Sequence, residues 1–167
     1  MSDIHFIITG RTIDSVYHPP TETSVPNKDS IISEYLNQKI HPHLNISYET
    51  LCMLDSGDIT DDRRAQVVTA IQEAASNHII ISHGTNTMVE TANYIKEHLQ
   101  GSTKTIILTG SMIPLKEFIM SDAGFNLGYA IAEAQNREHG VYICMHAKTF
   151  AAGTVTKNRT IARFEEA

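Results

Sequence analysis

The sequence is poor in the basic residues, cysteines and long apolar runs that mark several classes of protein. It has 13 Lys and Arg against 19 Asp and Glu, for a formal net charge of -6. Its basic residues form no stripe interleaved with aromatic ones, which argues against a nucleic-acid-binding surface. The negative charge also disfavours binding to anionic lipid, and no apolar stretch approaches the roughly 20 residues of a membrane helix. We therefore expect neither a nucleic-acid partner nor membrane association.

The N-terminus and the two cysteines indicate a cytoplasmic location. The first residues include no basic region and only a short apolar run, so we do not expect a signal peptide. Cys52 and Cys144 fall in segments that read as buried strands, where reduced thiols behave as ordinary core residues. The sequence thus predicts a protein of a reducing compartment.

The length of 167 residues suits one domain with its own core. Hydrophobic residues make up 41% of the chain, which excludes a disordered protein. No repeat, low-complexity segment or linker divides the sequence. We expect a single domain over residues 1–167.

Short apolar runs alternate with helical stretches along the chain. Strands are predicted at residues 4–9, 46–54, 78–83, 105–109 and 141–146, and helices at residues 31–38, 61–76, 87–99 and 121–137. A strand pair is expected within residues 153–164, and the polar, proline-containing stretch after the first strand predicts a long mobile loop. This order predicts an α/β fold, Rossmann-like, with a mostly parallel sheet and helices on both faces.

Hydroxyl side chains and glycines follow four of the predicted strands. The segments concerned are residues 9–14, 55–58, 83–87 and 109–112. One such cluster is ordinary turn composition. In parallel sheets, however, ligands bind outside the carboxyl ends of the strands, and glycines there let backbone N–H groups approach a ligand. Four clusters at one sheet edge therefore predict a binding site.

These segments resemble the signatures of the bacterial-type L-asparaginases, specifically of their N-terminal domain. Thr-Gly-Arg-Thr-Ile at residues 9–13 is similar to the family's Thr-Gly-Gly-Thr-Ile, and His-Gly-Thr-Asn-Thr at residues 83–87 is similar to His-Gly-Thr-Asp-Thr. Asp-Ser-Gly-Asp at residues 55–58 resembles the loop that binds the substrate carboxylate. Thr-Gly-Ser-Met at 109–112 and Gly-Thr-Val-Thr-Lys at 153–157 follow in the family's order. The resemblance runs along nearly the whole chain, which looks like a short, one-domain branch of the family.

The resemblance implies an amidohydrolase that converts L-asparagine to L-aspartate and ammonia without a cofactor or metal. Thr12 takes the position of the nucleophile, and Thr85 and Lys157 take those of the proton-relay pair. Tyr17 takes the place of a loop tyrosine that orients the nucleophile. The substrate-binding positions fall on Asp55, Ser56, Asn86 and Ser111.

The chemistry of these residue types fits the implied reaction. A threonine hydroxyl is a weak nucleophile unless a base takes its proton. A lysine acts as a base only when neutral, a form that burial favours. We expect His83 to support the site structurally rather than to act as a base. His41 and His43 lack a third ligand at metal spacing, so we expect no metal site.

Two site positions depart from the family pattern. Asn86 stands where the family has aspartate, and Arg11 stands where it has its second glycine. Both departures keep open an alternative, a non-catalytic amino-acid-binding or regulatory module that retains the pocket. A nucleotide-dependent Rossmann enzyme is disfavoured because neither G-x-G-x-x-G nor a Walker lysine motif occurs.

The resemblance also bears on assembly. In the family, the C-terminal domain of a neighbouring subunit helps to close each site. This sequence stops at Ala167 without a counterpart of that domain. We therefore expect a homo-oligomer whose second copy covers the pocket.

Overall fold

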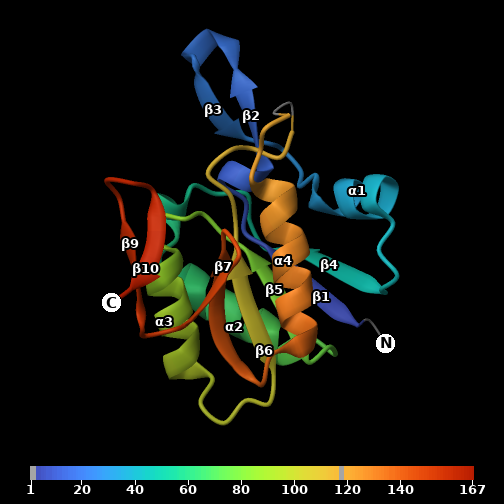
Figure 1. Cartoon of the computed structure of the whole chain (residues 1–167), viewed down its shortest axis with the longest axis vertical. Coiled ribbons are helices and arrows are strands. Elements are labelled where there is room, and N and C mark those ends of the chain that lie inside the picture. The colour runs from blue at the N-terminus through green and yellow to red at the C-terminus, as the bar shows by residue number, and fades with distance from the viewer. Residues whose placement is uncertain (1–2, 117–118) are drawn as a thin grey trace.

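A six-stranded sheet forms the centre of the computed structural model, which describes residues 3–116 and 119–167 (Figure 1). The strand order is β4-β1-β5-β6-β7-β8. Five strands run parallel: β1 (Ile4–Ile8), β4 (Ile46–Thr50), β5 (His78–Ser82), β6 (Thr105–Thr109) and β7 (Gly140–Met145). The last strand, β8 (Lys148–Ala151), pairs antiparallel to β7. The predicted α/β fold with a mostly parallel sheet is confirmed.

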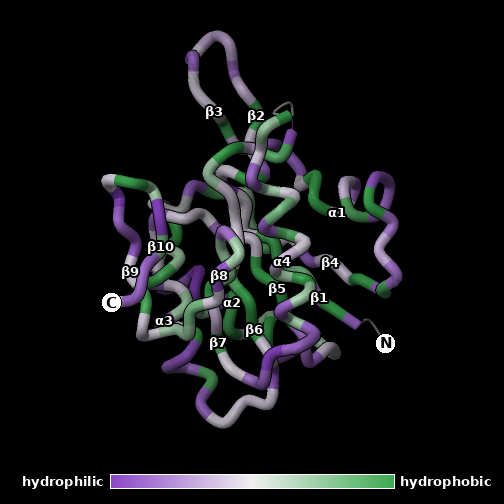
Figure 2. The backbone as a smooth tube through the Cα atoms, in the orientation of Figure 1, coloured by the Kyte–Doolittle hydropathy of each residue, from purple (hydrophilic) through white to green (hydrophobic). Residues whose placement is uncertain are grey.

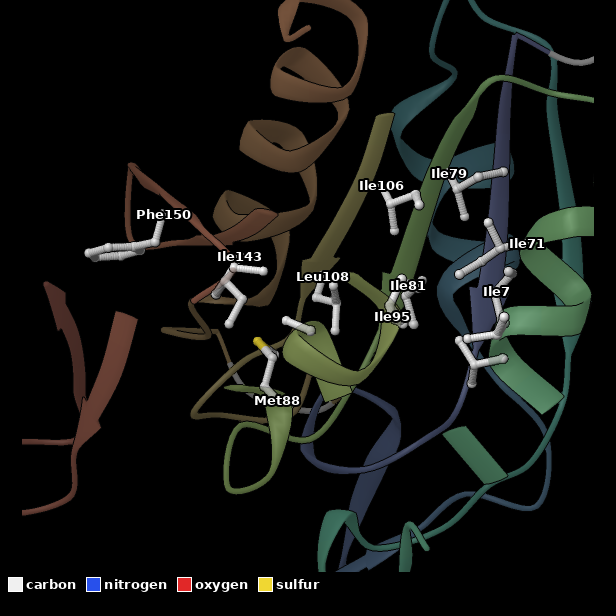
Figure 3. Packing of buried hydrophobic residues seen from close by; sticks show 14 of the residues in the cluster. Ile7, Ile71, Ile79, Ile81, Met88, Ile95, Ile106, Leu108, Ile143 and Phe150 are labelled. Atoms are coloured by element: carbon white, nitrogen blue, oxygen red, sulfur yellow. The ribbon is translucent and has the colours of Figure 1, made fainter. Parts of the chain in front are cut away.

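Helices cover both faces of this sheet (Figure 1). α2 (Asp61–Glu73) and α3 (Met88–His98) lie on one face, and α1 (Ile32–Tyr35) and α4 (Ala123–Asn136) lie on the other. Ile7 packs with α2 and α3, in the cluster of Figure 3, whereas Phe6 and Ile8 pack in the cluster of α1 and α4. Burial on both faces is the reason that these strands read as continuous apolar runs.

The segment after β1 differs from the predicted loop. β2 (Ser15–His18) and β3 (Thr23–Pro26) form an antiparallel hairpin that projects from the body of the molecule (Figure 1). Val16 lies opposite Val25, whereas most other residues of the two strands are exposed. The prolines fall in the turn and at the end of β3, where proline is tolerated. The sequence did not predict this hairpin because both of its faces are mostly polar. A strand is recognised in a sequence by the alternation of apolar and polar residues, which requires one buried face.

β8 was also absent from the predicted elements. It follows β7 through His146 and Ala147, which have φ values of 51° and 61°. Positive φ at both central residues is the geometry of a tight type I′ hairpin turn. Such turns are normally signalled by asparagine or glycine, and this turn has neither.

The predicted C-terminal strand pair is present as β9 (Val155–Asn158) and β10 (Arg163–Glu166). This hairpin lies beside α3 (Figure 1), and Val155 and Phe164 are buried in the cluster of α2 and α3. Lys157 stands opposite Phe164 in the register and lies on the same side of β9 as Val155. The anchored hairpin therefore turns Lys157 toward the body of the protein. Within the described ranges, no helix is both long and apolar enough to cross a membrane.

Candidate active site

The strand order reverses between β1 and β5. From β1 the chain continues to β4 on one side, and from β5 it continues to β6 on the other. Ligands bind at such a reversal of strand order. Ile8 pairs with Ser82, and the Thr9 N–H donates to the Ser82 carbonyl at 3.2 Å, so both loops leave the sheet at one level. The loop after β1 carries Thr12, and the loop after β5 carries Thr85.

Lys157 reaches the loop after β5 from the C-terminal hairpin. Its Nζ donates to Thr85 Oγ1 at 2.7 Å and to Asn86 Oδ1 at 2.8 Å. Burial lowers the pKa of Lys157, and the positive charges of Arg159 and Arg11 lower it further. A lowered pKa raises the fraction of neutral amine that is able to accept a proton. The structure thus brings together the hydroxyl and the amine of the predicted relay.

Asn86 and Lys157 line a cavity of about 190 Å³, with Val89, Glu90, Thr156 and Arg159 as the other lining residues. A larger hollow of about 670 Å³ lies at the start of β7 and the end of α3, at the opposite sheet edge. That hollow contains none of the predicted site residues. The chemistry therefore points to the smaller cavity.

Thr12 begins a 3-10 turn, Thr12–Asp14, directly after the β1 loop. Its side chain is half-buried, and its hydroxyl makes no hydrogen bond with any other residue that the structure describes. The turn is held by Asp14, whose carboxylate accepts from the Ser30 hydroxyl at 2.7 Å and from the Ile31 N–H at 2.9 Å. Burial raises the pKa of the Asp14 carboxyl. Sequence reasoning missed Asp14, because an acidic residue after a turn normally faces water.

Arg11 adopts a backbone conformation with φ 74° and ψ -160°. This region is essentially restricted to glycine, which is the residue of the resembling signature at this position. The guanidinium pairs with the carboxylate of Asp55, in the loop after β4. Burial lowers the pKa of Arg11, and the negative charge of Asp58 opposes that effect. Arg11 therefore ties the loop that carries Thr12 to the predicted substrate loop.

The carboxylate of Asp55 holds the predicted substrate loop in place. Asp55 Oδ1 accepts from the Gly57 N–H at 2.9 Å, and its Oδ2 pairs with Arg11. Both carboxylate oxygens are thus engaged within the protein. The side chain of Ser56 lies outside the part of the chain that the structure describes.

Ser111 lies in the loop after β6 and is buried. Its hydroxyl donates to the Ile113 carbonyl at 2.6 Å. The Asp122 carboxylate fixes this loop, because it accepts from the N–H groups of Met112 and Ile113 at 2.9–3.1 Å. The Thr85 hydroxyl lies 3.8 Å from the sulfur of Met112, which joins the loop to the relay. The role of Ser111 in substrate binding stays a prediction.

Tyr17 is placed on β2 of the projecting hairpin, opposite Ser24. Its side chain is 46% exposed, and its hydroxyl has no partner among the described residues. The structure thus shows no contact between Tyr17 and Thr12. An orienting role for Tyr17 stays a prediction.

His83 is fully buried behind the relay. Its Nδ1 lies 2.8 Å from the Gly84 carbonyl, which can only accept, so the ring proton sits on Nδ1. Nε2 then accepts from the Thr91 hydroxyl at 2.9 Å. Burial lowers the pKa of His83 to about 4, which keeps the ring neutral at physiological pH. These contacts support the expected structural role.

The hydroxyls at the strand ends differ in what they do. Thr9 donates to the Ser82 carbonyl and Thr109 to the Cys144 carbonyl, both at 2.8 Å, so these two link neighbouring strands. Thr85 instead faces Lys157. Across the described ranges, no group of three or more His, Cys, Asp or Glu side chains is arranged to hold a metal ion.

Comparison with known proteins identifies relatives of this chain. The family described as "Asparaginase, N-terminal" matches residues 3–164. The chain is 28% identical to a glutaminase-asparaginase of Acinetobacter glutaminasificans, over 96% of this chain and 51% of that protein. It is 30% identical to an L-asparaginase of Dirofilaria immitis, over 92% of this chain and 30% of that protein.

The solved structures agree with these relatives. The thermostable L-asparaginase of Thermococcus kodakarensis superposes with a TM-score of 0.84 at 25% identity, over 98% of this chain and 50% of that one. The chain therefore spans about half or less of the length of these proteins. Because the family match covers nearly all of its residues, the chain belongs to the asparaginase N-terminal domain family.

Proposed function

We propose that the protein is an amidohydrolase that releases ammonia from the side-chain amide of L-asparagine or a close relative. The observation that carries this proposal is the contact of 2.7 Å between Lys157 Nζ and the buried Thr85 hydroxyl, beside Asn86. A lysine of lowered pKa against a hydroxyl forms a proton relay. The names of the relatives, L-asparaginase and glutaminase-asparaginase, support the same reaction class.

Thr12 is the proposed nucleophile of this reaction. Its hydroxyl oxygen attacks the amide carbon, while its proton passes to the neutral amine of Lys157 through the Thr85 hydroxyl. The carbon–nitrogen bond then breaks, and the departing nitrogen takes a proton and leaves as ammonia. Water attacks the resulting ester and restores Thr12. The backbone N–H groups of the neighbouring turns are suited to bind the negative oxygen that forms during each attack.

A second candidate function is a non-catalytic amino-acid-binding module. Arg11 and Asn86 favour it, because the first ties the β1 loop to Asp55 and the second leaves the relay without a carboxylate. Such a module would bind an amino acid at the same sheet edge without turning it over.

Ammonia release from L-asparagine by the purified chain separates the two functions. We expect steady turnover in the wild type and loss of several orders of magnitude in kcat for Thr12→Ala, because the covalent step is removed. Thr69→Ala is the matched control, because Thr69 is an exposed threonine on α2 whose hydroxyl donates to the Ala65 carbonyl of its own helix. Near-normal turnover in Thr12→Ala would show that another group attacks. Calorimetric binding of asparagine without any turnover would favour the binding module.

We also propose that the reaction takes place in the cytoplasm. Cys52 and Cys144 are both free thiols, and Cys144 is buried. Burial raises the pKa of the Cys144 thiol to about 12, which keeps it unreactive. Unpaired core cysteines are typical of proteins from reducing compartments.

A further inference from the structure

Arg11 is held in a backbone conformation that strains any residue except glycine. Its φ is 74° and its ψ is -160°. Strain of this kind persists only where the surroundings enforce it, and it clusters at ligand-binding positions. The Arg11 carbonyl accepts from the Asp14 N–H at 2.7 Å and from the Ser15 hydroxyl at 3.2 Å, which fixes the turn. Glycine would avoid this strain, so the arginine directly before Thr12 is expected to have a role that depends on its side chain.

Basic side chains surround the relay. Arg11 and Arg159 lie near Lys157, and the positive charges of both arginines act on it. Lys157 itself contacts two neutral oxygens, and none of the described carboxylates lies within ion-pair distance of its Nζ. Asp55 is already engaged by Arg11 and by the Gly57 N–H. Asp58 acts on Arg11 rather than on Lys157. The amine of Lys157 therefore has two basic neighbours and no ion-paired carboxylate among the described residues.

The Arg11 guanidinium keeps free donors for a substrate. A guanidinium has five N–H donors in a planar fork that matches a carboxylate. Among the side chains that the structure describes, its one direct partner is Asp55 Oδ2. The remaining N–H groups stand next in the chain to the proposed nucleophile and are able to bind a second carboxylate.

Asn86 offers no negative charge to the ammonium group of a substrate. Its side-chain oxygen is neutral and accepts from Lys157 Nζ at 2.8 Å. Its cavity includes one carboxylate, Glu90, together with two cations, Lys157 and Arg159. An incoming α-ammonium would therefore meet two basic side chains against one carboxylate, which compensates poorly for its loss of water.

We infer that Arg11 is a specificity residue that selects anionic amides without an ammonium group, the monoamides of dicarboxylic acids, over zwitterionic asparagine. This inference rests on the proposed function, because it names the substrate of the same site. In the reaction, Thr12 attacks the amide carbon, the carbon–nitrogen bond breaks and ammonia leaves. Water then hydrolyses the ester, so that a monoamide and water give a dicarboxylate and ammonium.

Succinamic acid, which is asparagine without its α-amine, is the probe for kinetics. We expect kcat/KM for succinamic acid to exceed that for L-asparagine by about tenfold in the wild type. This ratio corresponds to the difference in free energy between a charge-assisted and a neutral hydrogen bond. Arg11→Gly should bring the ratio to about one. The variant should fold, because glycine adopts this conformation without strain, and its melting temperature checks this.

Arg137→Ala is the matched control. Arg137 is also an arginine paired with a carboxylate, that of Glu133, but it follows α4 at the opposite edge of the sheet. This variant should keep the wild-type ratio. Preference for asparagine in the wild type, or an unchanged ratio in Arg11→Gly, would overturn the inference while leaving the amidohydrolase proposal intact.

Binding of the reaction products tests the inference without turnover. By calorimetry, succinate should bind the wild type about tenfold more tightly than L-aspartate, and Arg11→Gly should lose that difference. If the folded protein hydrolyses neither amide, the proposed amidohydrolase function fails. The same binding preference would then still support anion selection by Arg11, whereas equal affinities for succinate and aspartate would overturn it.

Discussion

At the scale of single residues, Asn86 is a neutral side chain at a position where the resembling signature has aspartate. Asn86 accepts from Lys157 Nζ at 2.8 Å through an oxygen that a carboxylate could supply equally well. Aspartate has nearly the same shape and adds a negative charge. That charge would strengthen a hydrogen bond to a substrate ammonium, and it would also stabilise the protonated form of Lys157. Substrate binding and proton acceptance therefore respond to this position in opposite directions.

For Asn86→Asp, we expect KM for asparagine to fall about tenfold, because charged hydrogen bonds contribute roughly 1.5–3 kcal/mol against about 1 kcal/mol for neutral ones. The change in kcat should be smaller. Michaelis curves for both proteins at neutral pH measure the effect. An unchanged or raised KM in the variant would mean that the ammonium is held elsewhere or that the true substrate has none.

The pH dependence of the reaction should follow Lys157. Its pKa lies below the ordinary value because of burial and because of the charges of Arg159 and Arg11. In the proposed mechanism the neutral amine is the active form, so kcat/KM should rise with pH until Lys157 is deprotonated and then level off. Arg159→Ala removes one positive charge, which should raise the pKa of Lys157 and move the rise to higher pH.

A pH profile of kcat/KM for both proteins checks the sign of this shift. Arg137→Ala, at the far sheet edge, should leave the profile in place. A shift to lower pH in Arg159→Ala would rule out Lys157 as the base.

At the scale of elements, the C-terminal hairpin carries the relay lysine on a small apolar anchor. Phe164 and Val155 are buried in the cluster of α2 and α3, and Phe164 stands opposite Lys157 in the register. The distance from Lys157 to Thr85 thus depends on how firmly this hairpin packs. The hairpin is a sheet of two strands, which is marginal without such packing.

Phe164→Ala should therefore weaken both stability and catalysis. Removal of a buried phenylalanine costs about 3–5 kcal/mol, and a looser hairpin misplaces Lys157, so kcat should fall more than KM rises. Urea unfolding and steady-state kinetics measure the two effects. Ile161→Ala is the control in the same hairpin, because Ile161 is exposed and should change neither quantity. Unaltered kcat in a destabilised but folded Phe164→Ala would show that the hairpin does not position the base.

Helix α4 and its N-cap residue fix the positions of the loops after β6 and β7. Asn126 is fully buried, and its amide donates to the Gly110 carbonyl at 3.0 Å while its oxygen accepts from the His146 N–H at 2.9 Å. Asp122 holds the loop of Ser111 from the helix cap and also pairs with His146. One turn of helix thus fixes two loops, a role that no local sequence pattern reveals.

At the scale of the whole molecule, four large apolar side chains are exposed in the chain that follows β6. They are Ile113, Ile119, Met120 and Phe125. Figure 2 shows how hydrophobic and hydrophilic residues alternate along the backbone of the molecule. Exposed apolar side chains that gather in one place are typical of protein interfaces. We propose that a second copy of the chain covers these side chains in a homo-oligomer.

Sedimentation of the purified chain at micromolar concentration should therefore show a dimer or larger species. Replacement of both Ile119 and Met120 by serine should shift it toward the monomer, since their apolar surface would no longer be buried. Ile161→Ser removes an exposed apolar side chain elsewhere and should leave the assembly unchanged. A wild type that is strictly monomeric at this concentration would contradict the expectation.

The sequence by itself determined the five parallel strands, their succession along the chain and which loops carry hydroxyls. Each buried strand is a continuous apolar run, such as residues 4–8 and 105–109, because both of its faces are covered. The ordered signatures also predicted Thr12, Thr85 and Lys157 as site residues. Local composition and spacing are sufficient for these conclusions, since each depends on neighbours along the chain.

Only the tertiary structure decided which of these groups meet. Lys157 and Thr85 are 72 positions apart in the sequence and yet 2.7 Å apart in space, because the C-terminal hairpin packs beside α3. The strained backbone of Arg11 and its pairing with Asp55 likewise depend on β1 and β4 lying side by side. Contacts between distant segments arise from packing of the whole chain, whereas sequence patterns record only local preference.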